Sequence, residues 1–327
     1  MFYFWKRGFG TSILNIKMST ITFFFLIHYS DYGNHTEPRV ETCDKPPRLG
    51  RRPLGRTGIQ VSPIALSAWS VRAAGKAGLK LSASDVERAF HEHGINTFLV
   101  TWQMREVAEG VRRLVRAGHR DELVLITEVG IPTAGFISRG FEKNARALGV
   151  EMFDVVLLGW VQAHWYVTGK SWPAMLRLKE EGKTRAIGFS SHNRLLAARL
   201  AREIEVDVLM IRYNAAHRGA EREVFAAFGD DRPAFIAYTA TRWGMLLQPL
   251  PKAGFPKGMT APECYRFALS HPSVDMVLCA ARTPGEVRED VAGLLEGPLD
   301  PSRHAEACRY GDAVHAAARG GLRWMFR

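Results

Sequence analysis

The chain has 327 residues, which corresponds to about two average domains or to one barrel of roughly 250 residues with extensions. Apolar residues make up 46% and charged residues 24% of the chain, and these fractions exclude a disordered chain, a collagen-like repeat and a polytopic membrane protein. The formal net charge is +11, but the arginines are scattered and no aromatic ladder accompanies them. We therefore attribute the positive charge to general arginine richness or to an anionic cofactor, and we expect no nucleic-acid partner.

Residues 1–47 differ in composition from the rest and are expected to be an N-terminal extension, either disordered or the product of a mis-assigned start. The apolar run Ile21–Ile27 is too short for a membrane-spanning helix, which needs about 20 residues. A poor cleavage site follows this run, so a true start at Met18 or later is favoured over a signal peptide. Pro46 and Pro47 then form a stiff linker.

Strand signals begin after the linker. Two short arms flank Thr57-Gly58, which is typical of a small hairpin. Eight short apolar runs follow, and none alternates with polar residues, as expected of strands buried on both faces. These runs are Ile64–Ser67, Ile95–Val100, Leu123–Thr127, Asp154–Leu158, Ala186–Ser190, Val206–Ile211, Ala234–Tyr238 and Met276–Cys279.

Amphipathic segments lie between the runs and predict helices. Apolar residues recur at helical spacing in the segment after the second run and in the last one. They are Val107, Val111, Leu114 and Val115, and then Val287, Val291, Leu294 and Leu295. Strands that alternate with helices predict parallel βαβ units. Eight units favour a (β/α)8 TIM barrel over residues 48–327, with a short N-terminal β-hairpin cap and its chemistry at the carboxyl ends of the strands. No Gly-x-Gly-x-x-Gly follows the first strand, which disfavours a dinucleotide-binding doubly wound sheet.

Six segments between about residue 52 and about residue 297 are specific enough to compare with a known family. They are Leu54–Ser62, Gly94-Ile95-Asn96, Gly182–Ser190, Arg212-Tyr213-Asn214, Ala237-Tyr238 and Ala281–Pro284. Their sequences and order resemble the aldo-keto reductases. The resemblance implies a cytoplasmic, NADP(H)-dependent oxidoreductase that acts on a small-molecule carbonyl or alcohol substrate, away from membranes.

The catalytic tetrad of that family is replaced in this chain. In the family an aspartate, a tyrosine, a lysine and a histidine stand at the strand ends. There the tyrosine delivers a proton to the carbonyl oxygen, because an alkoxide forming in a dry pocket is very unfavourable. The residues at these positions here are Leu99, Met104, Glu128 and Gly159. Ordinary carbonyl reduction is therefore not expected in its usual form.

The nicotinamide side of the implied cofactor site is partly kept. The resemblance puts Ser190 and Ser191 where the family holds the carboxamide with a serine and an asparagine. Met210 replaces the glutamine of the next strand, and Tyr238 matches the tyrosine on which the nicotinamide stacks. Tyr238 also fits a simple filler of the barrel mouth, because core aromatic residues are common.

The adenosine side is kept better. Thr283–Glu286 has the pattern of a capping box with proline at the first helical position. A helix N-terminus beside Arg282 is an anion site on physical grounds, through its free N–H groups and the guanidinium fork. The resemblance implies that Glu286 and Asp290 reach the adenosine, and that the arginine favours NADP(H) over NADH. Thr283 would cap the helix whether or not a ligand binds.

Other residues are candidates for the missing proton donor. Glu128 is the first, because a carboxylic acid in an apolar mouth has a raised pKa and donates at neutral pH. His164, His192 and His217 are further candidates, and each also fits a loop histidine with a local hydrogen bond. They come from separate loops without His-Glu-x-x-His spacing, so no metal site is expected. The four cysteines lack C-x-x-C spacing, which indicates a reduced compartment.

Three functional hypotheses remain open. The chain is an NADP(H)-dependent oxidoreductase with a substituted proton donor, or a pseudoenzyme that serves as a cofactor-bound sensor or partner-binding barrel. The third is an anion-binding barrel that has lost NADP(H). The substitution Glu128→Gln separates the first two, because only an active enzyme has turnover to lose.

Overall fold

The computed structural model describes residues 48–68, 80–130 and 134–321. The expected extension, residues 1–47, lies outside the described residues. The predicted barrel is therefore compared with the structure over the described residues, which begin at Arg48.

A hairpin opens the described chain, as the sequence predicts. Strand β1 (Arg52–Pro53) pairs antiparallel with β2 (Gln60–Val61). The Leu54 N–H donates to the Ile59 carbonyl at 2.8 Å. Gly58 has a φ of +74°, the left-handed region that a tight turn requires and that glycine enters without steric cost.

The hairpin lies at the amino ends of the barrel strands. The Ser62 N–H donates to Asn96 Oδ1 at 2.7 Å, and Asn96 directly precedes a barrel strand. A Cβ added at Gly55 would lie 2.9 Å from Cα of Ala234, the first residue of another barrel strand. The hairpin is thus a cap on the end opposite to the one where chemistry is expected.

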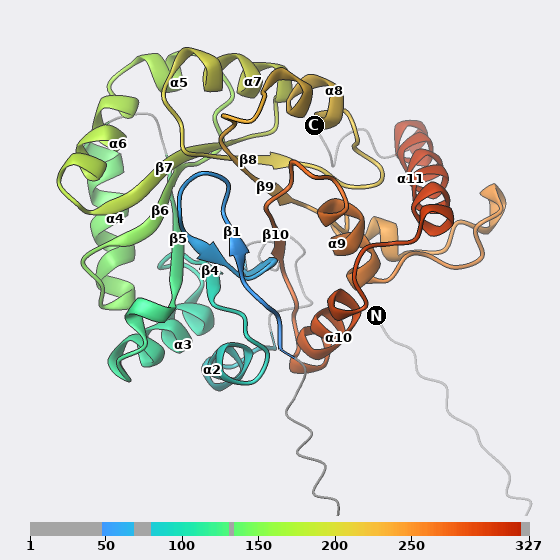
Figure 1. Cartoon of the computed structure of the whole chain (residues 1–327), viewed down its shortest axis with the longest axis horizontal. Helices are drawn as coiled ribbons and strands as arrows, with labels where there is room; N and C mark the ends of the chain where they lie inside the picture. Colours follow the sequence, from blue (N-terminus) through green and yellow to red (C-terminus); the bar gives the residue numbers. More distant parts are fainter. Residues whose placement is uncertain (1–47, 69–79, 131–133, 322–327) are drawn as a thin grey trace, which may run out of the picture. The chain divides into compact units, whose positions relative to one another are not determined.

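Eight parallel strands form a closed barrel in the order β10-β3-β4-β5-β6-β7-β8-β9 (Figure 1). Each of the eight predicted runs contains or overlaps one strand, so the predicted barrel is confirmed. The strands are β3 (Ile64–Leu66), β4 (Thr97–Leu99), β5 (Val124–Val129), β6 (Phe153–Leu158), β7 (Thr184–Ser191), β8 (Val208–Arg212), β9 (Ala234–Tyr238) and β10 (Met276–Cys279).

Helices connect the strands and lie around the outside of the barrel (Figure 1). The α-helices are α2 (Ala83–His91), α3 (Arg105–Arg116), α4 (Ala134–Leu148), α5 (Trp165–Thr168), α6 (Ser171–Glu180), α7 (Arg194–Glu203), α8 (Ala220–Glu223), α9 (Ala261–Leu269), α10 (Pro284–Leu295) and α11 (Pro301–Gly321). Short 3-10 turns are η1 (Arg120–Glu122), η2 (Phe225–Ala227), η3 (Met245–Leu247) and η4 (Pro251–Ala253). None of the described helices combines the length and the apolar character needed to cross a membrane.

The predicted helical faces are confirmed with one exception. Val107 and Val111 of α3 are fully buried, as is Val291 of α10. Leu295 is 48% exposed, so its predicted burial is wrong. It is the last residue of α10, where the side chain extends beyond the surface that the helix covers.

The last helix of the described chain, α11, was not predicted. Its buried face consists mainly of small residues, with Ala307 and Val314 on either side of Tyr310. Alanine contributes little to an apolar pattern, so the helical spacing is weak in the sequence although the burial is clear.

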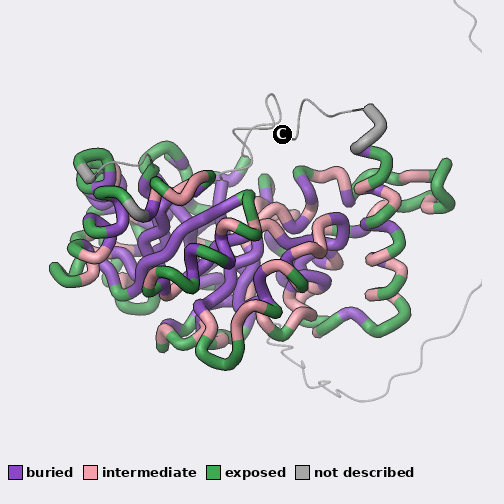
Figure 2. The backbone as a smooth tube through the Cα atoms, turned by 90° about the horizontal axis from the view of Figure 1, so that it is seen from above, coloured by how far each residue is buried: buried purple, intermediate pink, exposed green. Residues whose placement is uncertain are grey.

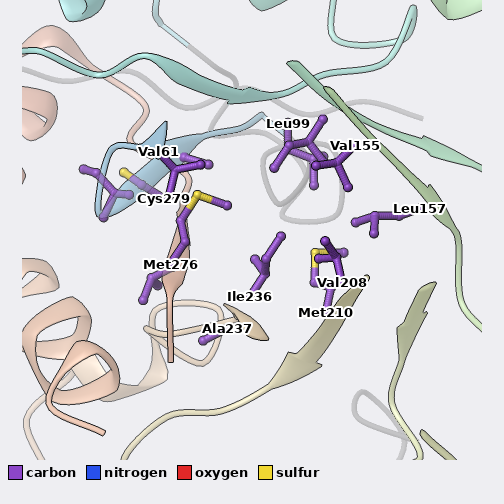
Figure 3. Close-up of a cluster of buried hydrophobic side chains, with 14 of the residues drawn as sticks. Val61, Leu99, Val155, Leu157, Val208, Met210, Ile236, Ala237, Met276 and Cys279 are labelled. Atoms are coloured by element: carbon purple, nitrogen blue, oxygen red, sulfur yellow. The ribbon is translucent and has the colours of Figure 1, made fainter. Parts of the chain in front are cut away.

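Strand residues are buried on both faces, as Figure 2 shows for the centre of the molecule. The Thr127 hydroxyl donates to the Val100 carbonyl and accepts from Asn144 Nδ2 of α4 at 2.8 Å, so Thr127 faces the helices. Successive residues of a strand point to opposite faces, and Glu128 therefore faces the barrel interior. Figure 3 shows the apolar side chains of that interior, among them Leu99 and Leu157.

Candidate active site at the carboxyl ends of the strands

Glu128 is a buried acid near the end of β5. Its side chain lies in register with Leu157 of β6, and the residue is only 9% exposed. Its Oε1 atom has no hydrogen-bond partner. Loss of water raises the pKa of Glu128 to about 7, although a hydrogen bond with the Ser190 hydroxyl acts in the opposite direction. The carboxyl group is therefore close to half protonated at neutral pH.

The residues that the resemblance puts at the three other tetrad positions bring no ionisable side chain to this acid. Leu99 and Met104 are buried apolar residues. Gly159 lies beside the acid, because a Cβ added there would be 3.9 Å from Glu128 Oε1. The structure thus brings Glu128 and Gly159 together, in an apolar wall that explains why the acid is desolvated.

Ser190 and Ser191, at the end of β7, bond with the loop that follows β6. Ser190 Oγ accepts from the Trp160 N–H at 2.9 Å, and Ser191 Oγ donates to the Val161 carbonyl at 2.7 Å. Both hydroxyl groups therefore hold the protein's own backbone. They position this loop, and the Ser190 hydroxyl also hydrogen-bonds with Glu128.

Tyr238 ends β9 and shares the mouth with His192. The Tyr238 hydroxyl lies 3.1 Å from the Ser191 carbonyl oxygen, to which it donates, and 3.0 Å from His192 Nδ1. Burial raises the pKa of Tyr238, and the nearby Arg212 guanidinium acts in the opposite direction. Burial, and then Arg212, lower the pKa of His192. At neutral pH the pair is an uncharged phenol and an uncharged imidazole with fixed ring positions.

The other two candidate histidines have partners away from Glu128. His164 Nε2 lies 2.7 Å from Oε2 of Glu203, in α7. His217 Nδ1 lies 3.2 Å from Asn214 Oδ1. The His217 contact is local, as expected of a loop histidine, whereas His164 contacts a residue 39 positions along the chain.

The start of α10 forms the predicted cap only in part. Thr283 Oγ1 accepts from the Glu286 N–H at 3.1 Å, and Pro284 occupies the first helical turn. Glu286 does not return to the Thr283 N–H. Its carboxylate instead accepts from the Arg282 N–H at 2.6 Å and lies 3.0 Å from Arg282 Nη2. The Arg282 side chain is 51% exposed, so its guanidinium remains accessible at this helix N-terminus.

Asp290 lies in the core rather than beside Arg282. It is 2% exposed and accepts a hydrogen bond from Cys279 Sγ at 3.2 Å. Burial raises its pKa to about 7. The structure brings together Arg282, Thr283 and Glu286, and it turns Asp290 toward β10.

Two arginines at the mouth were missed by sequence reasoning. Arg212 is the last residue of β8, one residue beyond the predicted run, and Arg242 follows Tyr238 by four residues. Arg242 is almost fully buried. A charged residue at the end of an apolar run, where barrel chemistry is expected, was the available signal.

Comparisons with known proteins agree with this architecture. The model of the aldo/keto reductase family matches residues 68–253. D-threo-aldose 1-dehydrogenase from Pseudomonas sp. is 26% identical over 120 residues, which cover 36% of this chain and 36% of that protein. The matched part thus spans about a third of the relative's length.

Solved structures are similar over most of the chain. Aldo-keto reductase AKR11C1 from Bacillus halodurans, in its holo form, has a TM-score of 0.64 and 17% identity, covering 82% of this chain and 96% of that one. The thermostable aldo-keto reductase Tm1743, in complex with the inhibitor epalrestat, has a TM-score of 0.63 and 17% identity, covering 81% and 100%. At this identity the similarity shows the barrel fold.

Proposed function

This chain belongs to the aldo/keto reductase family, and from that premise we propose that it is an oxidoreductase that binds NADP(H) and uses Glu128 as its proton donor. The observation that carries the proposal is the Glu128 carboxyl group. It is buried inside the barrel near the carboxyl end of β5, its Oε1 has no partner, and its pKa is raised to about 7. Such an acid is suited to donating a proton at neutral pH.

The residues present fit NADP(H). Arg282 offers an accessible guanidinium at the N-terminus of α10, where the helix dipole favours a negative group. We assign the 2′-phosphate to this arginine and to the helix start that Thr283 caps, and the adenosine to Glu286, with Asp290 supporting the helix from the core. Tyr238, whose ring is fixed by Ser191 and His192, would face the nicotinamide.

NADPH supplies a hydride to a small-molecule carbonyl compound in this proposal. The chain's own residues bind the substrate, exclude water and hold the proton at Glu128. Leu99 and Met104 keep the wall apolar, which disfavours the charged form of Glu128 and maintains the acid. Gly159 leaves room beside Oε1 for a substrate oxygen. Ser190 positions the loop at Trp160 and hydrogen-bonds with Glu128.

A second candidate function is a cofactor-bound sensor without turnover. The observation that favours it is the engagement of both Ser190 and Ser191 hydroxyl groups with backbone, together with non-ionisable residues at three of the four tetrad positions.

For an active enzyme, His164 is the second candidate proton donor after Glu128. Its contact with Glu203 must open before it can act.

Titration with NADPH and NADH, followed by tryptophan fluorescence, tests whether the chain binds the cofactor. We expect micromolar NADPH binding that is weakened by Arg282→Ala. The matched control is Arg288→Ala, which removes an exposed arginine from the same helix and should leave binding unchanged. Absence of binding of either nucleotide at millimolar concentration would overturn both cofactor hypotheses.

Glu128→Gln tests whether Glu128 is the proton donor. A screen of carbonyl compounds with NADPH should reveal turnover that Glu128→Gln abolishes, while NADPH binding is kept. Turnover that survives in the variant would remove Glu128 from the mechanism, and His164→Asn would be measured next. NADPH binding with no turnover on any compound would support the sensor.

A further inference from the structure

Arg212 and Arg242 meet at the mouth of the barrel. Val208 and Met210 of β8 face the interior in Figure 3, and the period of two puts Arg212 on the same face at the strand's end. Arg212 is also in register with Tyr238 of β9. Arg242 comes from the loop after β9 and is 4% exposed. The two guanidinium groups are therefore close together at the mouth, one from the end of β8 and the other from the loop after β9.

Neither arginine has the partner that a buried cation normally requires. Arg242 Nε and Nη1 and Arg212 Nε are buried without a hydrogen-bond acceptor. Over residues 48–68, 80–130 and 134–321, no carboxylate forms an ion pair with either side chain. An unpaired buried charge and unsatisfied N–H donors both destabilise a fold. The missing acceptor is thus a feature that folding alone does not explain.

The neighbouring groups make the site more positive. Burial, followed by the charge of Arg212, lowers the pKa of Arg242. Burial, followed by Arg212 and Arg242, lowers the pKa of His217 to about 3. Arg194 also acts on Arg212, although its own guanidinium is paired with Glu223 at 2.6 Å. An uncompensated field of one sign in a desolvated mouth attracts an anion.

The backbone that carries Arg242 is held in an unfavourable conformation. Thr239, Arg242 and Trp243 have φ values of 55°, 51° and 51°, which are costly for residues with a Cβ. Asn214 Nδ2 donates to the Thr239 carbonyl at 2.8 Å and ties this loop to the end of β8. This strained loop thus holds Arg242 at the mouth.

We propose that Arg212 and Arg242 bind the carboxylate or phosphate group of an anionic substrate. Guanidinium groups bind oxyanions with paired, charge-assisted hydrogen bonds, and the unpartnered nitrogens supply the donors. In the closed barrel β5 and β9 are four strands apart, so Glu128 lies across the mouth from this site. The substrate is therefore an oxo acid or a phosphorylated carbonyl compound, with the anion at β8 and β9 and the carbonyl toward Glu128. The substrate part of this inference rests on the proposed function.

Calorimetric titration of the full chain with malonate tests the anion site, with uncharged malonamide as the matched probe. We expect one malonate to bind per chain and malonamide to give no heat. Arg212→Gln and Arg242→Gln should each weaken malonate binding by about tenfold or more. Arg177→Gln removes an exposed arginine from α6 and should change nothing. Absence of malonate binding to the wild-type chain, or unchanged binding in both mouth variants, would overturn the proposal.

NADPH distinguishes a substrate anion from the diphosphate of the cofactor. If Arg212 and Arg242 bind the substrate, malonate binds the NADPH-saturated chain and both mouth variants keep their NADPH affinity. Displacement of malonate by NADPH, with loss of NADPH affinity in both variants, would assign the arginines to the cofactor and overturn the substrate reading. Malonate binding without any NADPH binding would support the anion site while refuting the proposed function. If the variants do not fold, malonate titration of Arg282→Ala decides, because this chain keeps the mouth arginines and lacks the other anion site.

Discussion

Replacement of Glu128 by glutamine should change stability in a pH-dependent way. Glutamine resembles the protonated acid in size and hydrogen-bonding groups, but it cannot ionise. Glu128 is buried and its pKa is raised from 4.5 to about 7 by desolvation. The native state therefore binds this proton more tightly than the unfolded chain does. The stability that this group contributes is present below its unfolded pKa and is lost as the pH rises through about 7.

The size of the effect follows from the pKa. At about 1.4 kcal/mol for each pKa unit, the rise corresponds to about 3.5 kcal/mol lost from the wild-type chain above neutral pH. Glutamine avoids that loss. In a chain of this size, where the unfolding entropy is about 0.7 kcal/mol per degree, we expect the variant to melt roughly 5 °C higher than wild type at a pH of about 8. At a pH of about 4.5 or below, the two should melt close together.

Thermal unfolding of both chains across this pH range is the assay. The control is Glu180→Gln, which removes an exposed carboxylate from α6 and should show no pH-dependent gain. A difference between Glu128→Gln and wild type that stays constant with pH would refute the reasoning. The carboxyl group would then be hydrated or paired, and its use as a neutral-pH acid would lose its physical basis.

Four further outcomes are expected. Arg242→Met should raise the free energy of unfolding by about 1 kcal/mol or more in a urea titration, because it removes an unpaired buried charge. Gly188→Ala should lower it by about 3 kcal/mol or more, since the new Cβ would lie 1.8 Å from the Val208 carbonyl oxygen. Asp290→Asn should show the pH signature of Glu128→Gln in thermal scans, because burial raises the Asp290 pKa to about 7. Steady-state reduction should slow as the pH rises above about 7, because the acid form of Glu128 is then lost.

The barrel was predictable because its signals are local and repeated. Every barrel strand is a short apolar run, and a run such as Ala234–Tyr238 coincides with β9 in both bounds. The hairpin was equally clear, because Thr57-Gly58 marks the turn. Helix α11 was not predicted, because its buried face depends on contacts between small residues and the rest of the fold. Such contacts leave little periodicity to detect.

The site was predictable in its location but not in its partners. Sequence placed Glu128 at a strand end, and the structure adds that Oε1 lacks a partner. The sequence predicted a capping box in which the Glu286 carboxylate binds the Thr283 N–H, whereas this carboxylate binds Arg282. The resemblance implied that Asp290 reaches the adenosine, whereas in the structure it is buried and bonds with Cys279. Hydrogen-bond partners depend on the tertiary fold, which one-dimensional spacing does not encode.

The unpaired charges at the mouth argue that this end of the barrel is adapted to a ligand. Glu128 and Arg212 lie at one end of the same barrel, and an ion pair between them would relieve both desolvation penalties. The described structure contains no such pair. Glu128, with a pKa of about 7, remains about half protonated at neutral pH, and Arg212 has no acceptor at Nε. Each group is therefore held in the state that a substrate can use, one as a proton donor and the other as an anion receptor. A barrel that served only as a scaffold would gain stability by replacing both residues with apolar ones, so their retention in a desolvated mouth favours chemistry at this site over a purely structural role.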